Sequence, residues 1–214
     1  MAAADVFIIH DEVQYVKTWI NRNKILVNGQ ARYIILPVKK NFIASSIYQQ
    51  VFAPPVLKYR KRFLRQIEGA YRGAPYFNEV FEMLKSICGS TETNLTHFLA
   101  DHLIKLCTYI GIKNTFFLSS QLSNNNGLKG QDRVIEINRI MGSNHYINSI
   151  GGKKLYSQDA FNHAGIKLSF LETNDIYYTQ FQNQFVPSLA IIDILMFNDT
   201  KTLKKMIGAY RLVS

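Results

Sequence analysis

The chain has 214 residues, of which 47% are hydrophobic and 13% aromatic, and it carries a formal net charge of +10 at pH 7. This composition excludes an intrinsically disordered chain, and the length is sufficient to bury a core without disulfides. The positive charge favours anionic ligands, such as nucleotides, nucleotide-sugars, nucleic acid or lipid headgroups, but a basic surface with no specific partner would have the same composition.

The first half of the chain predicts a strand, a hairpin and three helices. Residues 5–9 (DVFII) are typical of a buried strand. Residues 24–38 contain two β-rich arms around Asn28-Gly29, a strong hairpin signal because a type I′ turn requires positive φ at both central positions. Apolar residues then recur at helical spacing. The three helices are expected at about 56–71, 75–88 and 94–110.

The second half alternates strands with helices. Strands are expected at 114–120, 145–150 and 166–172, and helices at 131–142 and 157–165, where Ser157 is a plausible N-cap. This spacing predicts parallel βαβ units. An edge strand at 176–181 and two helices at about 188–198 and 200–210 complete the pattern.

These elements predict an α/β fold. We expect a single domain over residues 1–214, with a three-layer, mostly parallel sheet, a helical insertion or cap at about 55–110, and C-terminal helices. In such sheets, ligands bind at the carboxyl ends of the strands. This rule selects the loops that follow residues 5–9, 114–120 and 145–150.

Cysteine usage and hydropathy indicate the compartment. Cys88 and Cys107 lie in helix-like apolar patterns and are expected to be free thiols. The N-terminus lacks the basic and apolar regions of a signal peptide, and the longest apolar run, residues 189–197, is shorter than the ~20 residues that span a bilayer. We therefore expect a cytoplasmic protein without a transmembrane segment.

Residues 11–23 form the chemically densest segment and follow the first predicted strand. Amides, hydroxyls and basic groups there suit a sugar and a phosphate, and the only tryptophan suits stacking on a base or sugar. We predict Asp11 as the catalytic acid/base or amine-binding group. The predicted substrate-binding residues of the segment are Gln14, Tyr15, Lys17, Trp19, Asn21, Arg22 and Asn23. The alternative is a solvated loop with one aromatic anchor.

Two glycine-containing loops also follow predicted strands. The loop at 119–133 opens a helix, where backbone N–H groups near the glycines can cradle an anion. It matches neither a P-loop nor a dinucleotide-binding fingerprint. The second loop, at 149–156, is a glycine turn with two lysines. The candidate binding residues of the two loops are Ser120, Lys129, Gly130, Asp132, Arg133, Gly151 and Gly152, and Asp132 has a helix-start role as its alternative.

Asp193 lies in the apolar run LAIIDILMF, where an unpaired carboxylate is costly. We expect its partner to be an Arg, a Lys or a backbone N–H group. The carboxylate is either one half of a structural buried pair or an orienting group for the site. Asn198 is a candidate for capping the C-terminal end of the same helix.

Other polar features favour structural roles. The basic residues between 58 and 65 lie mostly off the apolar stripe of their helix, and such a face is usually only solvated. His97, Asp101 and His102 lack the order of zinc-protease ligands, so no metal site is predicted. The absence of a nucleophile elbow disfavours a covalent hydrolase.

Seven sequence blocks occur in the order found in WbqC-like proteins, and the chain resembles this family from residue 5 to about residue 198. The blocks are DEVQYVKTWINRNKILVNG, GAPYF, SS-x-L, KGQDRV, YINSIGGKKLY, F-x-x-x-GI-x-L-x-FL and FVPSLAIIDILMFN. Family members usually begin with a further strand and a Gln-Pro-aromatic-rich segment. Because this chain begins at Met1-Ala2, the resemblance implies that the segment is missing and that a sheet edge is exposed. His10 stands where tyrosine is common, which weakens it as a catalytic candidate.

The resemblance implies a bacterial transferase of surface-polysaccharide (O-antigen) biosynthesis, with glycyl or aminoacyl transfer to an amino-sugar as the suggested reaction. The implied partner is a phosphorylated small molecule, an amino-sugar nucleotide. No cofactor is evident from the sequence. One alternative is a nucleotide-dependent adenylating or ligase-type enzyme, which would use ATP. The other is a non-enzymatic module that binds anions or nucleic acid, which the sparse interleaving of basic and aromatic residues disfavours.

Overall fold

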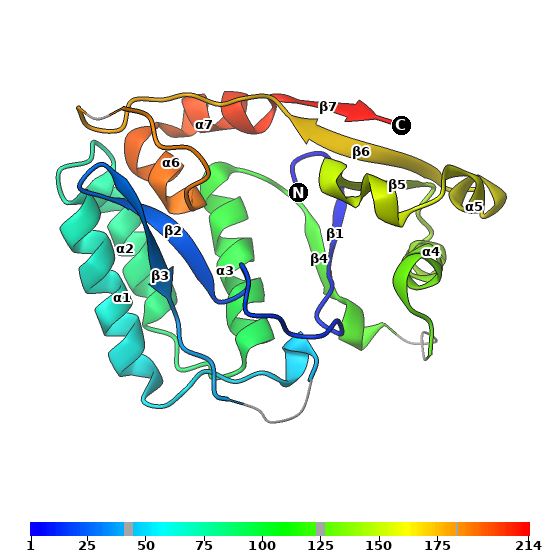
Figure 1. Cartoon of the computed structure of the whole chain (residues 1–214), viewed down its shortest axis with the longest axis horizontal. Helices are drawn as coiled ribbons and strands as arrows, with labels where there is room; N and C mark the ends of the chain where they lie inside the picture. The colour runs from blue at the N-terminus through cyan, green and yellow to red at the C-terminus, as the bar shows by residue number, and fades with distance from the viewer. Residues whose placement is uncertain (41–44, 123–126, 183) are drawn as a thin grey trace. The chain divides into compact units, whose positions relative to one another are not determined.

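The computed structural model describes residues 1–40, 45–122, 127–182 and 184–214. The chain divides into two compact units (Figure 1). The first unit comprises Met1–His10, Ile112–Ile176 and Met206–Ser214, and the second comprises Asp11–Gly111 and Tyr177–Lys205. The predicted helical segment at 55–110 therefore lies within the second unit.

The strands of the first unit form two small sheets. β1 (Val6–Ile9) pairs in parallel with β4 (Thr115–Leu118). In the other sheet β5 (His145–Ser149) pairs in parallel with β6 (Lys167–Thr173), and β6 pairs antiparallel with β7 (Tyr210–Val213). The helical elements of this unit are α4 (Gly130–Ile140), α5 (Gln158–His163) and the 3-10 helices Ser119–Gln121 and Ile150–Leu155.

The core of the first unit lies between its two helices and β6. Val134 and Ile135 of α4, Phe161 of α5, and Leu168 and Phe170 of β6 are buried in one cluster. The helices begin where the sequence predicts. The Ser157 hydroxyl accepts a hydrogen bond of 3.4 Å from the N–H of Ala160 and caps α5, as predicted.

The second unit combines a hairpin with helices. β2 (Arg22–Val27) and β3 (Gln30–Ile35) pair antiparallel around the predicted turn, where Asn28 and Gly29 have φ values of 51° and 73°. The predicted hairpin is confirmed. The helical elements are α1 (Val56–Tyr71), α2 (Phe77–Cys88), α3 (Leu95–Ile110), α6 (Ile191–Phe197), α7 (Thr200–Ile207) and the 3-10 helix Ile47–Gln49.

The apolar stripes of the three long helices form the core of the second unit. Phe63 and Ile67 of α1, Leu84 of α2, and Leu95 and Phe98 of α3 are buried. These side chains recur every three or four residues, so each helix turns one face inward and leaves the opposite face polar. α7 carries the chain from the second unit back into the first.

The predicted α/β class is confirmed, with parallel strand pairs and interspersed helices. Among the described residues the strands are distributed over three small sheets of two, two and three strands. Three local predictions were wrong. Residues 176–181 form no strand, Gly151-Gly152 lie in a 3-10 helix instead of a turn, and the last helix ends at Ile207, so that a strand follows it.

Cys88 and Cys107 are free and buried, as predicted. Within the described part of the chain, none of the helices has the length and apolar character needed to cross a membrane.

Candidate functional site

The outer face of the hairpin gathers two aromatic rings and two cations. Because β2 and β3 pair with Lys24 opposite Tyr33, both side chains lie on one face of the ribbon, and Arg22 follows on the same face two residues away. Trp19 precedes β2, and its ring centroid lies 6.4 Å from that of Tyr33. We call Trp19, Arg22, Lys24 and Tyr33 the cation–aromatic face.

The cations of this face lie close to its rings. The Lys24 Nζ is 5.8 Å from the Trp19 ring centroid and 5.4 Å from that of Tyr33, and the Arg22 Cζ is 5.0 Å from the Tyr33 centroid. Trp19 and Tyr33 are nevertheless 58% and 50% exposed. Rings this exposed can stack on a ligand while the cations bind its phosphate.

Two predicted binding residues hold the segment onto the hairpin. The Tyr15 hydroxyl donates a hydrogen bond of 2.9 Å to the Asn21 Oδ1, and the Asn21 Nδ2 donates one of 2.9 Å to the carbonyl of Leu36. Burial raises the pKa of Tyr15, and the nearby Arg22 partly offsets that shift. These polar groups bond within the protein and connect the two sides of the loop that carries Trp19.

The other predicted residues of the segment differ in accessibility. Gln14 and Lys17 are exposed, whereas Asn23 is half-buried and its Oδ1 accepts a hydrogen bond from the N–H of Lys24. Asp11 is only 1% exposed, and its carbonyl accepts a hydrogen bond of 2.9 Å from the N–H of Tyr48. The predicted acid/base is thus a buried carboxylate.

The first glycine loop places its candidates around the start of α4, although residues 123–126 lie outside the described part of the chain. Lys129 is the exposed residue before the helix, Gly130 begins it with φ of 54°, and Asp132 lies in the first turn, where a carboxylate complements the helix dipole. Arg133 is buried, and its guanidinium donates a hydrogen bond of 3.2 Å to the carbonyl of Ser119. Ser120, the residue after Ser119, is exposed.

The second glycine loop packs tightly. Gly151 is exposed, whereas Gly152 is buried against the Asn148 side chain, since a Cβ at Gly152 would lie 2.8 Å from the Asn148 Nδ2. Close packing accounts for glycine at this position without a ligand.

Asp193 is fully buried, and its hydrogen-bond donors are neutral side chains. The Tyr71 hydroxyl donates to one carboxylate oxygen, and the Tyr178 hydroxyl and the Gln180 Nε2 donate to the other, each at 2.7 Å. The prediction of a basic or backbone partner was therefore wrong, because three neutral donors supply the compensation. Asn198 follows α6, and its Nδ2 donates to the carbonyl of Ile194, so its predicted capping role is confirmed.

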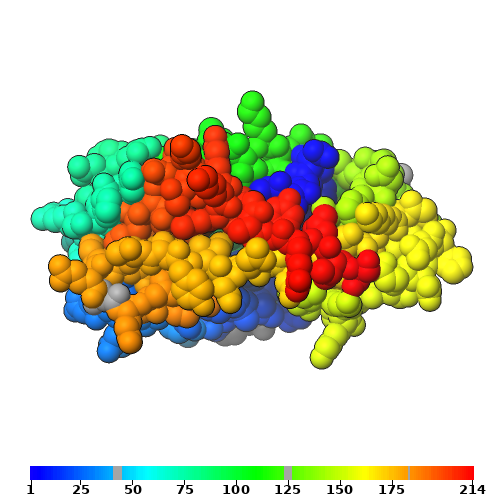
Figure 2. Space-filling model, turned by 90° about the horizontal axis from the view of Figure 1, so that it is seen from above, coloured from blue at the N-terminus to red at the C-terminus, as the bar shows by residue number. Residues whose placement is uncertain are grey.

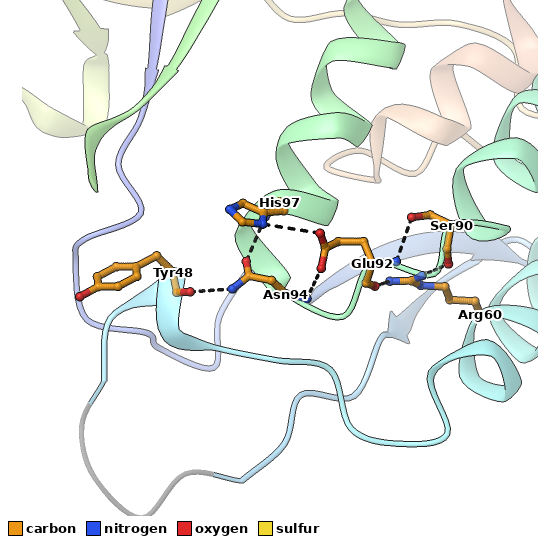
Figure 3. A network of polar contacts seen from close by, with 6 residues as sticks. All are labelled: Tyr48, Arg60, Ser90, Glu92, Asn94 and His97. Carbon is orange, nitrogen blue, oxygen red and sulfur yellow. Dashed lines mark hydrogen bonds and ion pairs between the residues drawn. The ribbon is translucent and has the colours of Figure 1, made fainter. Parts of the chain in front are cut away.

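His97 and His102 of α3 make contacts within the protein. Figure 3 shows Asn94 at the start of α3 accepting a hydrogen bond from the N–H of His97, while the His97 ring lies 3.5 Å from Glu92. His102 packs edge-on against Phe98 at 5.8 Å. The described residues contain no cluster of metal-ligating side chains.

Arg60 is a buried cation whose partners the sequence did not suggest. Its guanidinium donates to the carbonyls of Ser90 and Glu92, as Figure 3 shows, and lies 3.9 Å from the Phe98 ring centroid. The two bonded carbonyls and the aromatic face offset part of the cost of burial, whereas the buried Nε has no hydrogen-bond partner among the described residues. These contacts assign Arg60 to the core.

The predicted site residues thus fall into a group in each unit. Tyr15, Trp19, Asn21 and Arg22 lie together on or beside the hairpin. Two members of the cation–aromatic face, Lys24 and Tyr33, were missed. The signal that identifies them is the Asn28-Gly29 turn, because a two-residue loop fixes which residues face each other across the hairpin.

Comparison with known proteins places the chain in a family. The model of the WbqC-like protein family matches residues 1–205. An uncharacterized protein of Mycobacterium tuberculosis (strain ATCC 25618 / H37Rv), Rv1507c, is 24% identical over 204 residues, which cover 91% of this chain and 84% of that protein. No solved structure matches the chain. Since the family model extends over almost the whole sequence, the chain belongs to the WbqC-like protein family.

Proposed function

We propose that this protein binds a phosphorylated amino-sugar, carried on a nucleotide, at the cation–aromatic face and transfers a glycyl or similar aminoacyl group to the sugar amine. Membership of the WbqC-like family associates the chain with polysaccharide biosynthesis. The observation that carries the proposal is the exposure of Trp19 and Tyr33 beside Lys24 and Arg22.

This combination suits a ligand with a flat ring and a phosphate. An aromatic side chain that stacks on a base contributes about 1–3 kcal/mol. A cation next to the stacked ring then meets the phosphate of the same ligand, and arginine can bind it with two parallel hydrogen bonds. Lys17 is exposed in the same segment and is the proposed additional phosphate contact.

Acyl transfer to an amine requires a base. The amine nitrogen attacks the acyl carbon of an activated donor, the leaving group departs with its electron pair, and a carboxylate takes the amine proton. Asp11 is the proposed carboxylate. Because it is 1% exposed, its role needs a test separate from that of the cation–aromatic face.

We propose a separate anion-binding site in the first unit, at the start of α4. Lys129 is exposed, and the helix that follows has 11 residues, so its free N–H groups present partial positive charge. Gly130 and Ser120 belong to this site. The buried Arg133 holds the preceding loop in position by donating a hydrogen bond to the carbonyl of Ser119.

Intrinsic fluorescence gives a direct binding assay, because Trp19 is the only tryptophan. Amino-sugar nucleotides are titrated into the protein, and a saturable change in emission is expected. The double variant Trp19→Phe/Tyr33→Ala should weaken binding at least tenfold, and calorimetry measures it without relying on tryptophan. Tyr177→Ala, which removes another exposed aromatic ring of the second unit, is the matched control. No binding across a panel of amino-sugar nucleotides would refute the proposal.

The transfer step is tested separately. The protein is incubated with an amino-sugar nucleotide and activated glycine donors, and the product is sought by mass spectrometry as the sugar mass plus one glycyl group. Binding without product would remove the transferase part and leave a ligand-binding protein. That second function is favoured by one observation, namely that the rings of the face are exposed to a ligand while the predicted base is buried.

A further inference from the structure

A row of basic side chains follows the exposed side of α1. Their spacing of three, four, seven and fourteen residues places them on one face of an α-helix, within an arc of about 100° and over about 21 Å. All are exposed, and α1 lies at the outside of the second unit (Figure 1). The row, which we call the basic stripe, consists of Lys58, Lys61, Arg62, Arg65 and Arg72.

The stripe is almost uncompensated. Glu68 is the only acidic residue of α1, and it forms an ion pair with Arg72 at the end of the row. The other four cations take part in no ion pair among the residues that the structure describes. Like charges on successive turns repel one another, so the row is held together by the helix and not by its own contacts.

The opposite face of the helix fixes the stripe in place. Phe63, Ile67 and Tyr71 are buried in the core of the second unit, so α1 is anchored before any ligand arrives. At its N-terminal end the exposed surface is apolar, since Leu57 is 47% exposed and Pro54 and Pro55 precede it on the surface. A row of cations therefore adjoins a small apolar edge.

We infer that the basic stripe is a docking surface for the anionic headgroups of a lipid bilayer. The stripe lies along a single convex helix and can lie flat on a surface. Cations near an anionic bilayer are attracted additively, and an exposed leucine can enter the interfacial layer. This surface is independent of the proposed transferase function.

The chemistry of the stripe favours lipid over a polynucleotide. Proteins that bind single strands combine cations with aromatic rings on which bases stack. The aromatic residues of α1 are Tyr59, Phe63 and Tyr71, and all of them are buried or half-buried. The stripe therefore presents positive charge without stacking surfaces, as suits the headgroups of an anionic bilayer.

Sedimentation with vesicles tests the inference on the full chain. Vesicles of phosphatidylcholine alone are compared with vesicles that contain about one third phosphatidylglycerol, at low and at high salt. The stripe variant carries Lys58→Gln, Lys61→Gln, Arg62→Gln and Arg65→Gln. The control variant carries Lys105→Gln, Lys113→Gln, Lys167→Gln and Lys201→Gln, which are exposed elsewhere. Each variant loses four charges, from +10 to +6, so that net charge is matched.

We expect the wild type to bind only the anionic vesicles and to lose most of this binding at high salt. The stripe variant should lose at least about 100-fold in partition coefficient, and the control variant less than about tenfold. Circular dichroism verifies that both variants fold. Equal losses in the two variants would show attraction by net charge alone and overturn the inference. The inference is also overturned if no anionic vesicle binds, or if single-stranded DNA binds through the stripe more tightly than the vesicles.

Discussion

The Tyr71 hydroxyl donates a hydrogen bond of 2.7 Å to the buried carboxylate of Asp193, and the same oxygen accepts one of 2.8 Å from the backbone N–H of Leu26. One hydroxyl thereby connects α1, α6 and the strand that carries Lys24. Burial, and the carboxylate beside it, raise the pKa of Tyr71, so the hydroxyl stays protonated and able to donate.

Tyr71→Phe should destabilise the protein more than Tyr178→Phe. The first change leaves both the Leu26 N–H and one Asp193 oxygen without this partner, which costs about 2–3 kcal/mol. The second removes one donor from an oxygen that still accepts from Gln180, and should cost about 1 kcal/mol. Urea unfolding measures both. If the two variants unfold at the same midpoint, the bridging role of Tyr71 is wrong.

Two of the three side chains that donate hydrogen bonds to Asp193 come from the segment that precedes α6. Figure 2 shows its described residues in orange on the face in view. Tyr177 is 71% exposed, whereas Tyr178 and Gln180 turn toward Asp193. An edge strand was predicted at residues 176–181. Among the described residues, the backbone of this segment pairs with no strand. The segment is instead attached through the hydrogen bonds of its side chains to Asp193.

Local signals in the sequence predicted the hairpin and the helices well. The Asn28-Gly29 turn and the apolar stripe of α1 act over a few residues, and tertiary contacts agreed with both. The turn even sets the register that brings Tyr33 opposite Lys24. That part of the candidate site was therefore available from sequence.

The partners of Asp193 could not be predicted in the same way. Tyr71 and Asp193 are 122 residues apart, and no local pattern relates them. A buried carboxylate requires donors, but hydroxyl and amide groups satisfy it as well as a cation does. Arg60 gives the same lesson, since it is a basic residue of a helix whose basic face was expected to be solvated, yet it lies in the core over Phe98.

Lys24→Gln should weaken the proposed phosphate contact of the cation–aromatic face. A hydrogen bond to a charged group contributes about 1.5–3 kcal/mol, so the dissociation constant for an amino-sugar nucleotide should rise about tenfold or more. Binding by the variant should also depend less on salt. Lys39→Gln, an exposed lysine outside the face, is the control. A phosphate-free amino-sugar that loses affinity equally would argue against the contact.

Asp11→Asn distinguishes a catalytic from a structural carboxylate. If Asp11 takes the amine proton, kcat should fall about 100-fold or more while the unfolding midpoint and KM change little. Glu12→Gln is the matched control, since Glu12 is the neighbouring carboxylate and is half-buried where Asp11 is buried. A lower unfolding midpoint with unchanged kcat for the folded fraction would assign Asp11 to the structure instead.

His102 should make the stability of the protein depend on pH. Burial lowers its pKa to about 4, and the positive charge of Lys105 acts in the same direction. In the unfolded chain a histidine titrates near 6.5, so below that pH the unfolded state binds a proton that the folded state does not. The stability due to the neutral ring is complete above pH 6.5 and is lost as the pH falls from about 6.5 toward 4.

This loss amounts to about 2 kcal/mol between pH 7.5 and pH 5. His102→Leu should abolish that part of the pH dependence, because a leucine beside Phe98 keeps the apolar contact and has no proton to bind. Urea unfolding at the two pH values, for the wild type and the variant, measures the difference. His163→Gln, which replaces an exposed histidine, is the control. If the wild type and His102→Leu lose the same stability on acidification, His102 is not the group responsible.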